Sequence, residues 1–450
     1  MFRLFDTATG RVRPLELRDP GAVSVYLCGP TVYDLPHLGH GRHALVWDVL
    51  RRYLEWTGLA VRFVSNITDV DDNIIRRADQ EGRTEAAVAA EFEARWFDAL
   101  DALGVLRPTA DPHATAYVPR MVELVGELVT RGAAYELSDG VYLDTGQVPG
   151  YGLLARQPLD SLRAGSRVEV DASKRSPLDF VLWKKAKPGE PSWESPWGPG
   201  RPGWHTECVV MSLDLLGDGF DLHAGGQDLA FPHHENERAQ AVALDRAFAR
   251  HWGHHAFVVA KGGEKMSKSL GNFTSLPDLL ERHDPRAYRL LVLRAHYRSP
   301  LEVTPATIGD AEAGLARLDS LGRRMPESAR SGPADPAALD EFRAAMDDDL
   351  DTPRVVALLF DLVRRANTAL DAGADPSGEW AAIEQIAGAL GLGVAVGNQT
   401  VAAEIDDLVA RRDQARAARD FVAADAARDE LVARGYVVED TPAGTRVRPA

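Results

Sequence analysis

The sequence has few cysteines, no long apolar run and no excess of basic residues, and each deficit argues against a class of protein. Only Cys28 and Cys208 occur among 450 residues, which excludes a disulfide framework and is typical of a reducing compartment. No run of about 18 apolar residues is present, so we predict no membrane-spanning helix. Residues 1–10 lack a basic segment followed by an apolar one, so we expect no secretory signal and a cytoplasmic protein.

The balance of charge is acidic, with 51 Lys and Arg against 67 Asp and Glu and a formal net charge of −16. This balance argues against a nucleic-acid partner, because phosphate backbones attract basic surfaces. Net charge is an average, however, and a large acidic enzyme can still bind RNA through local basic and aromatic faces. The total charge therefore lowers the expectation of an RNA partner without removing it.

The first part of the chain has the pattern of an α/β domain. Residues 23–28 alternate like a strand, a loop rich in glycine and proline follows, and apolar residues then recur at helical spacing up to Leu54. A second alternating run follows at residues 61–65. This strand, turn, helix and strand unit is the building block of a parallel sheet whose ligands bind at the strand ends. We predict a Rossmann-type catalytic domain over residues 1–303, with an insertion at about 113–203.

The pattern changes after Thr304 and Pro305, which together are typical of a helix start. From there the chain is almost wholly helical, and we predict an α-helical bundle over residues 304–395. The last segment, residues 396–450, contains a charged helix pair followed by two short alternating runs around a turn at residues 442–444. We predict a small α+β module there.

Residues 37–40 (HLGH) follow the first predicted strand and open its helix. A helix N-terminus offers free N–H groups and a positive dipole end to an anion, and two imidazoles add hydrogen-bond donors for phosphate oxygens. The four-residue pattern alone is a weak signal. Two surface histidines at a helix start are the alternative.

A second candidate motif, residues 265–269 (KMSKS), lies in a predicted loop bounded by glycines and belongs to a wider region at about 260–300. Lysines and hydroxyls on a flexible loop suit the neutralisation of charge on a departing phosphate group. A solvated basic turn is the alternative. The two motifs together are far more specific than either alone.

Together the two motifs resemble those of class I aminoacyl-tRNA synthetases, in which a HIGH-type motif and a KMSKS loop bracket ATP. The first motif here departs from HIGH only at its second position. The resemblance implies attack of an amino-acid carboxylate on the α-phosphate of ATP, with Mg²⁺ accompanying the nucleotide. It implies that His37 and His40 stabilise the transition state and that Lys265 and Lys268 hold pyrophosphate. The other ATP contacts that it implies in these motifs are Gly39 and Ser267, with Lys268 again.

Four further residues form a candidate metal-binding set. His233 and Glu237 are four positions apart, so on a helix beginning after Pro232 they project from one face. Adding Cys28 and Cys208 gives two sulfurs, one nitrogen and one oxygen, which is a recognisable zinc environment. Because the residues come from distant segments, spacing alone leaves a second possibility, namely buried structural thiols beside a helical surface pair. The neighbouring His234 points about 100° away and is not expected to be a ligand.

The local sequences at residues 28–34, 200–208 and 225–237 are similar to those of the cysteine-specific branch of that synthetase family. The resemblance implies one Zn²⁺ per chain, held by Cys28, Cys208, His233 and Glu237, that binds the thiol of the substrate L-cysteine as thiolate. Zinc coordination would distinguish cysteine from serine, whose hydroxyl is a poor ligand, and from alanine, which offers none. A separate editing domain would then be unnecessary.

The same resemblance implies several further substrate contacts. Gly29 and Thr68 would contact the amino acid, and Trp204 would line its pocket, with an ordinary core tryptophan as the alternative. Gly226 would permit close approach of the adenosine, and the Asp228 carboxylate would accept hydrogen bonds from it. A loop-stabilising hydrogen bond is the alternative for each single contact.

The resemblance extends through nearly the whole chain and implies a cysteine–tRNA ligase with tRNA(Cys) as its partner. We expect a monomer, although the sequence does not reveal the oligomeric state. Residues 304–395 would contact tRNA and residues 396–450 would read the anticodon. The C-terminal arginines that could contact phosphate are 411, 412, 416, 419, 428 and 434.

Two other functions remain open. An enzyme joining cysteine to an aminosugar-inositol in mycothiol synthesis shares both motifs and the zinc set, but has no use for an anticodon-reading end. A non-catalytic synthetase-like RNA-binding protein has no requirement for lysines that stabilise pyrophosphate.

Overall fold

The computed structural model describes residues 1–156, 173–259, 275–395, 403–418, 420–441 and 444–449. The KMSKS motif at residues 265–269, with Lys265, Ser267 and Lys268, therefore lies outside the described residues. None of the helices in the described ranges is long and apolar enough to cross a membrane.

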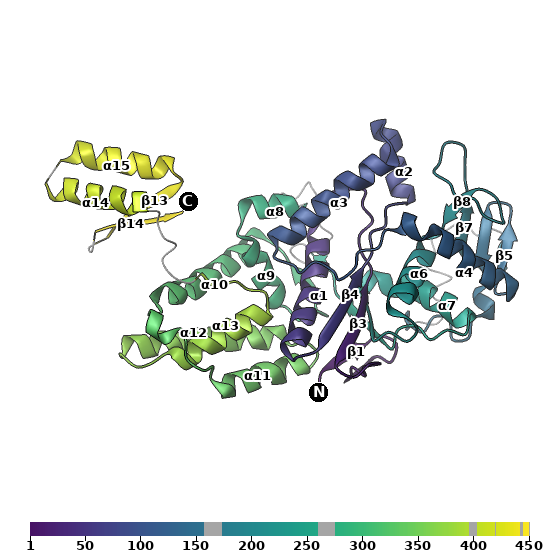
Figure 1. The fold of residues 1–450 in the computed structure, drawn as a ribbon, viewed down its shortest axis with the longest axis horizontal. Coiled ribbons are helices and arrows are strands. Elements are labelled where there is room, and N and C mark those ends of the chain that lie inside the picture. The colour runs from purple at the N-terminus through teal and green to yellow at the C-terminus, as the bar shows by residue number, and fades with distance from the viewer. Residues whose placement is uncertain (157–172, 260–274, 396–402, 419, 442–443, 450) are drawn as a thin grey trace. The chain divides into compact units, whose positions relative to one another are not determined.

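A four-stranded parallel sheet lies at the centre of the first part of the chain and confirms the predicted Rossmann-type architecture (Figure 1). Its strand order is β10, β9, β3, β4, and the bounds are His251–His255, Leu222–Gly226, Ala22–Leu27 and Ala60–Ser65. The chain leaves β3 towards β4 on one side and runs from β9 to β10 on the other. The switch point between β3 and β9 is where ligands bind in such sheets.

Helices cover this sheet and connect its strands. Helix α1 (Leu38–Trp56) follows β3, and its apolar positions at helical spacing are buried, as the periodicity predicts. Helix α3 (Glu85–Ala102) occupies the predicted span because Thr84 accepts a hydrogen bond from the Ala87 amide and caps its start. The other helices packed in this part are α2 (Asp72–Glu81), α6 (Trp204–Leu216), α7 (Glu235–Ala243), α8 (Leu276–Arg282) and α9 (Pro285–Leu293).

The segment predicted as an insertion contains helix α4 (Val118–Thr130) and an antiparallel sheet in the order β5, β6, β7, β8. The strand bounds are Ala134–Leu137, Gly140–Leu143, Phe180–Lys185 and Gly200–Pro202. Two further strand pairs lie beside the central sheet, namely β1 (Arg3–Asp6) with β2 (Arg11–Pro14), and β11 (Val258–Val259) with β12 (Leu301–Glu302). The pair β11 and β12 is parallel and connects segments on either side of α8 and α9.

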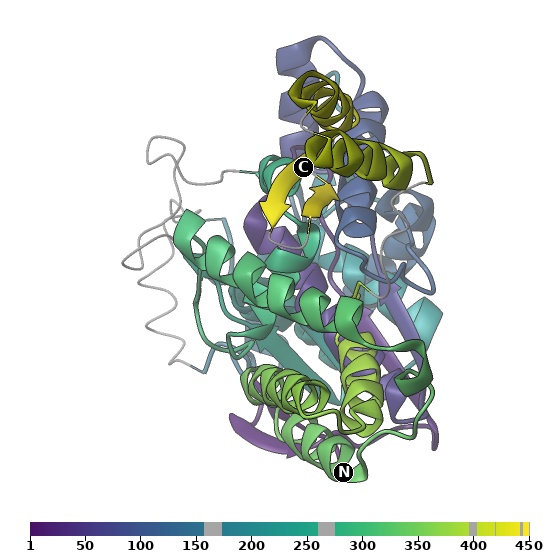
Figure 2. The same cartoon turned by 90° about the vertical axis from the view of Figure 1, so that its left-hand side faces the viewer.

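The chain is helical from residue 305 to 389, as predicted, with α10 (Pro305–Arg324), α11 (Pro336–Asp347), α12 (Thr352–Asp371) and α13 (Ser377–Ala389). Helices α11 to α13 pack against one another (Figure 2). Proline stands in the first turn of α11 and α12, behind the capping residues Asp335 and Asp351, whose carboxylates accept backbone hydrogen bonds.

The chain divides into two compact units, residues 1–316 with 331–393, and residues 317–330 with 394–450. The boundaries at 303 and 395 stay predictions. The second unit contains α14 (Ala403–Ala417), α15 (Phe421–Ala433) and the hairpin of β13 (Tyr436–Thr441) and β14 (Gly444–Pro449). These elements form an apolar cluster of their own around Ile405, Leu408 and Leu431. Of the arginines expected to contact phosphate, Arg412 is buried and donates to Thr445 Oγ1, so it is not available at the surface.

Candidate metal centre and active site

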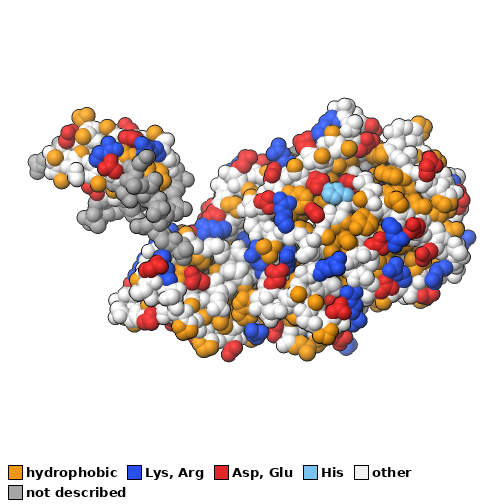
Figure 3. Space-filling view, in the orientation of Figure 1, with side chains coloured by type: hydrophobic (Ala, Val, Ile, Leu, Met, Phe, Trp, Pro, Cys, Tyr) orange, Lys and Arg blue, Asp and Glu red, His pale blue; other side chains and the backbone are white. Residues whose placement is uncertain are grey.

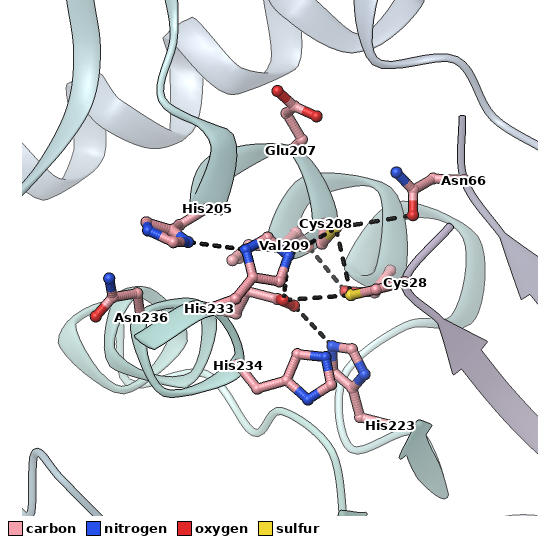
Figure 4. A network of polar contacts seen from close by, with 12 residues as sticks. Cys28, Asn66, His205, Glu207, Cys208, Val209, His223, His233, His234 and Asn236 are labelled. Atoms are coloured by element: carbon pink, nitrogen blue, oxygen red, sulfur yellow. Dashed lines mark hydrogen bonds and ion pairs between the residues drawn. The ribbon is translucent and has the colours of Figure 1, made fainter. Parts of the chain in front are cut away.

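Four side chains from three distant segments meet at the switch point of the central sheet (Figure 4). Cys28 directly follows β3, and Cys208 lies on α6. His233 and Glu237 lie where the short helical segment η4 (Ala230–His234) runs into α7, and they project to the same side as their spacing predicts. All four are buried, with at most 4% of any residue exposed.

The donor atoms have the separations that a zinc ion requires. Cys28 Sγ lies 3.6 Å from Cys208 Sγ and 3.5 Å from Glu237 Oε1. His233 Nε2 lies 3.6 Å from Cys208 Sγ and 3.1 Å from Glu237 Oε1. A disulfide, at about 2.05 Å, is excluded by the first distance. Zinc–sulfur bonds of about 2.3 Å and zinc–nitrogen bonds of about 2.0 Å place tetrahedral donors roughly 3.3–3.8 Å apart, so the four residues fit this ion.

The chemistry of the donors fits the same ion. Two thiols with an imidazole select zinc over hard cations such as magnesium or calcium. Burial, followed by the neighbouring Cys208, raises the pKa of the Cys28 thiol, and a cation at this position would favour the thiolate instead. Burial lowers the pKa of His233 well below its usual value, so its imidazole is neutral, which is the form that coordinates metals.

Two histidines orient these ligands from outside the cluster. His223, on β9, places Nε2 2.7 Å from Glu237 Oε2, which leaves Oε1 facing the other three donors. His205 Nδ1 lies 2.8 Å from His233 Nδ1, which leaves His233 Nε2 facing the two sulfurs. Such contacts fix the orientation of a ligand and raise metal affinity.

A second group of donors, Cys28, His223, His234 and Glu237, also lies within 4.8 Å. It shares two residues with the first group, so the two groups describe one site. His234 Nδ1 is 2.9 Å from His254 Nε2, and His223 Nε2 is hydrogen-bonded to Glu237. The His223 contact favours the first group, because it leaves His223 supporting a ligand. The His234 contact engages only Nδ1, so the expectation that His234 is not a ligand stays a prediction.

The HLGH residues form the N-terminus of α1. The rings of His37 and His40 stack at 3.8 Å, and each Nδ1 accepts the backbone N–H of the other residue, at 3.3 Å and 3.2 Å. A Cβ on Gly39 would lie 2.8 Å from His37 Cε1, so glycine permits this arrangement. Burial lowers the pKa of His40 to about 3 and also lowers that of His37, so both rings are neutral at physiological pH. They can donate hydrogen bonds to an anion there but carry no charge.

The predicted adenosine contacts lie beside these histidines. Gly226 ends β9, and a Cβ on it would lie 2.5 Å from Asp228 Oδ1. Asp228 is exposed, and its charge acts on His37, although burial has the larger effect on that histidine. The structure therefore brings Asp228 near the HLGH turn, and its contact with adenosine stays a prediction.

The residues predicted to contact cysteine lie around the cluster. Trp204 is 39% exposed and its ring lies 4.0 Å from that of His233, so it is not a core tryptophan and can form a wall of the pocket. Thr68 is buried, accepts from Asn66 Nδ2 at 3.2 Å and donates to Glu207 Oε2 at 3.0 Å. A Cβ on Gly29 would lie 1.6 Å from the Asn66 carbonyl oxygen, so this glycine has a structural reason to be present.

Four residues of the site were not predicted from the sequence, namely Asn66, His205, Glu207 and His223. His205 and Glu207 lie within three positions of Cys208, and this proximity was the signal available. No local sequence signal pointed to His223, because its partner Glu237 is 14 residues away and only the packing of β9 against α7 brings the two together.

Comparison with known proteins agrees with this geometry over almost the whole chain. The catalytic domain of tRNA synthetases class I (C) matches residues 14–313, the DALR domain matches 341–395, and the cysteinyl-tRNA ligase anticodon binding domain matches 398–448. The chain belongs to the cysteine–tRNA ligase family. It is 45% identical over 464 residues to the cysteine–tRNA ligase of Halorhodospira halophila, covering 100% of this chain and 99% of the relative. It is 46% identical over 466 residues to that of Alkalilimnicola ehrlichii, covering 100% of both.

Solved structures of other synthetases share the fold of this member of the cysteine–tRNA ligase family. Methionyl-tRNA synthetase of Mycobacterium tuberculosis bound to methionyl-adenylate superposes with a TM-score of 0.61 at 16% identity, over 90% of this chain and 96% of that one. An arginyl-tRNA synthetase from Campylobacter jejuni, described as putative, gives 0.52 at 13% identity, over 86% and 95%. These likenesses confirm the class I synthetase fold.

Proposed function

We propose that this chain activates cysteine with ATP to cysteinyl-adenylate and transfers the cysteine to the 3′ end of tRNA(Cys). The observation that carries the proposal is the buried donor cluster of two sulfurs, one imidazole and one carboxylate beside the HLGH turn. The family match over the full length supports it. Pyrophosphate leaves when the cysteine carboxylate attacks the α-phosphate, and AMP leaves when a terminal tRNA hydroxyl attacks the adenylate carbonyl.

Cys28, Cys208, His233 and Glu237 would hold one Zn²⁺. When bound, this ion would act as a Lewis acid that favours the thiolate form of the substrate cysteine. Serine and alanine offer no comparable ligand for zinc. Trp204 lies against His233 and would exclude larger side chains. Gly29 and Thr68, at the ends of neighbouring parallel strands, would contact the amino acid.

The HLGH turn would bind the triphosphate. The N-terminus of α1 presents its positive dipole end, and the neutral rings of His37 and His40 would donate to phosphate oxygens. Gly39 keeps the rings close, while Gly226 and Asp228 would approach the adenosine. From the resemblance, Lys265 and Lys268 would hold the leaving pyrophosphate together with Ser267, and Mg²⁺ would arrive with ATP.

One assay tests this function. The purified protein should catalyse exchange of labelled pyrophosphate into ATP that depends on cysteine, and should then transfer cysteine to tRNA(Cys). Serine and alanine in place of cysteine should give little exchange. A protein with no cysteine-dependent exchange would contradict both enzyme functions, and transfer to an aminosugar-inositol but not to tRNA would favour the sugar ligase. The match of residues 398–448 to an anticodon-binding domain favours the tRNA outcome.

A further inference from the structure

Arg42 is fully buried, although arginine rarely is without a carboxylate partner. It lies on α1, two positions after the HLGH motif. Within the described part of the chain its hydrogen-bond partners are backbone carbonyl oxygens, not carboxylates. Its two terminal nitrogens donate to Phe257 at 2.7 Å, His296 at 3.3 Å, Tyr297 at 3.0 Å and Ser299 at 2.6 Å. Burial lowers its pKa to about 10, so the guanidinium still carries its charge at neutral pH.

The carbonyls that Arg42 binds lie at the junction of two chain segments. Phe257 stands between β10 and β11, and Tyr297 and Ser299 lead into β12. Two of these carbonyls also accept a backbone hydrogen bond across the junction. The Leu301 amide donates to the Phe257 carbonyl, and the Ala256 amide donates to the Tyr297 carbonyl, both at 2.9 Å. Arg42 therefore ties α1 to the point where β11 and β12 begin to pair. Phe257 itself is 49% exposed, so its main-chain contacts rather than packing of its side chain fix this position.

The same first turns of α1 also contact the chain where α8 begins. The Leu276 amide donates a hydrogen bond to the Pro36 carbonyl oxygen at 2.7 Å. The Tyr288 hydroxyl donates one to the Leu38 carbonyl oxygen at 2.6 Å. A Cβ on Gly41 would lie 2.9 Å from Tyr288 Cε1 and 3.0 Å from Leu276 Cδ1, so glycine permits this close packing. Residues 36–42 thus hold both the end of β10 with β11 and the start of α8.

We propose that Arg42 is a positioning residue for ATP, because its bonds to four backbone carbonyls anchor the first turns of α1 and, with them, the HLGH turn. This inference rests on the proposed function. In the proposed function the HLGH turn binds the phosphates, and a displacement of about 1 Å of a group that holds a substrate can cost about a hundredfold in rate. Arginine suits this task because its planar fork reaches several carbonyls at once, whereas lysine is a point donor.

Arg42→Lys tests the inference. It keeps the charge but cannot reach all four carbonyls, so the KM for ATP in pyrophosphate exchange should rise between about tenfold and a hundredfold. The KM for cysteine and the zinc content should stay at wild-type values. Arg42→Met should have a larger effect in the same direction. Arg51→Lys is the matched control, since Arg51 lies on the same helix but bonds to Glu55 and the Arg107 carbonyl.

A merely structural role predicts a different result. It would lower the unfolding temperature of Arg42→Lys and leave the KM for ATP unchanged, or raise the KM of both substrates equally, and either outcome overturns the inference. If Arg42→Met does not fold, Arg42→Lys alone decides. Equilibrium dialysis with ATP separates this inference from the proposed function. Wild-type protein that binds ATP without exchange would contradict the function, while equal ATP affinity in wild type and Arg42→Lys would overturn the positioning role.

Discussion

Cys208 supplies one of the two sulfurs of the candidate metal centre, and its replacement tests the centre directly. Serine is close in size, but its hydroxyl is hard to deprotonate and is a poor zinc ligand. We expect Cys208→Ser to lower zinc affinity by more than the roughly 10–100-fold that follows loss of an outer contact, and to abolish cysteine-dependent exchange. Elemental analysis and the exchange assay measure both. Ser212→Ala, on the same helix, is the control, and full activity with unchanged zinc in Cys208→Ser would exclude the site.

His223 is hydrogen-bonded to Glu237, so it would act on a metal at this centre only through that carboxylate. Replacing His223 with leucine leaves Glu237 Oε2 without its 2.7 Å partner, so the carboxylate loses its fixed orientation. We expect His223→Leu to lower zinc affinity about 10–100-fold, measured by competition with a chromophoric chelator at constant pH. His113→Gln, which changes a histidine paired with Glu93 at 2.9 Å, should keep wild-type affinity. Unchanged zinc affinity in His223→Leu would show that Glu237 needs no such support.

Contacts within the candidate site could be predicted from the sequence only between residues that are related by a local pattern. His233 and Glu237 share a helical face, so their pairing follows from helix geometry. That Cys28 and Cys208 join them was implied only by the family resemblance, because the spacing of distant segments left buried structural thiols as an alternative. The contacts of His223 and Arg42 could not be predicted in this way. Their partners lie 14 and more than 200 residues away, and only tertiary packing brings them together.

Among the secondary-structure elements, those with a clear period were predicted well. Helix α3 and strands β3 and β4 have regular spacing of apolar residues over six or more positions. The insertion was read as irregular, yet it contains β5 to β8. These strands have only three to six residues each, so too few positions repeat for the period to show.

The start of helix α11 carries a pH-dependent contact. Asp335 accepts from Arg365 at 2.9 Å and from the Ala337 amide at 3.0 Å, and the arginine contact lowers the pKa of this carboxyl below 3.8. The unfolded chain therefore binds the proton more readily, so the stabilisation is present above pH 3.8 and is lost as the pH falls through the lower folded pKa. Asp335→Asn keeps a capping side chain but loses the ion pair.

We therefore expect Asp335→Asn to lower the free energy of unfolding by no more than about 1 kcal/mol at neutral pH. The difference from wild type should shrink as the pH falls below 3.8. Urea unfolding at a series of pH values measures it. A difference that stays constant down to the lowest pH would mean that the ion pair contributes nothing.

Taken as a whole, the molecule is acidic, yet its proposed partner is an RNA. The charges on the face seen in Figure 3 are interspersed, with Lys and Arg beside Asp and Glu. Several arginines of the second unit are already engaged, since Arg411 pairs with Asp407 at 3.0 Å and Arg434 with Glu430 at 2.7 Å. An exposed arginine in the described part of this unit is therefore the place to test for an RNA contact. Arg428, exposed on α15, is the one that we would change first.

Arg428→Glu should weaken transfer of cysteine to tRNA and leave cysteine-dependent exchange intact, because activation takes place in the first unit. If Arg428 contacts one phosphate, the slope of the logarithm of the tRNA KM against the logarithm of salt concentration should fall by about 1. Arg11→Glu makes the same change of net charge at an exposed position on β2 and should leave both reactions unchanged. Equal losses in Arg428→Glu and Arg11→Glu would attribute the effect to net charge. A loss confined to Arg428→Glu would place an RNA contact on α15, against the acidic balance of the chain.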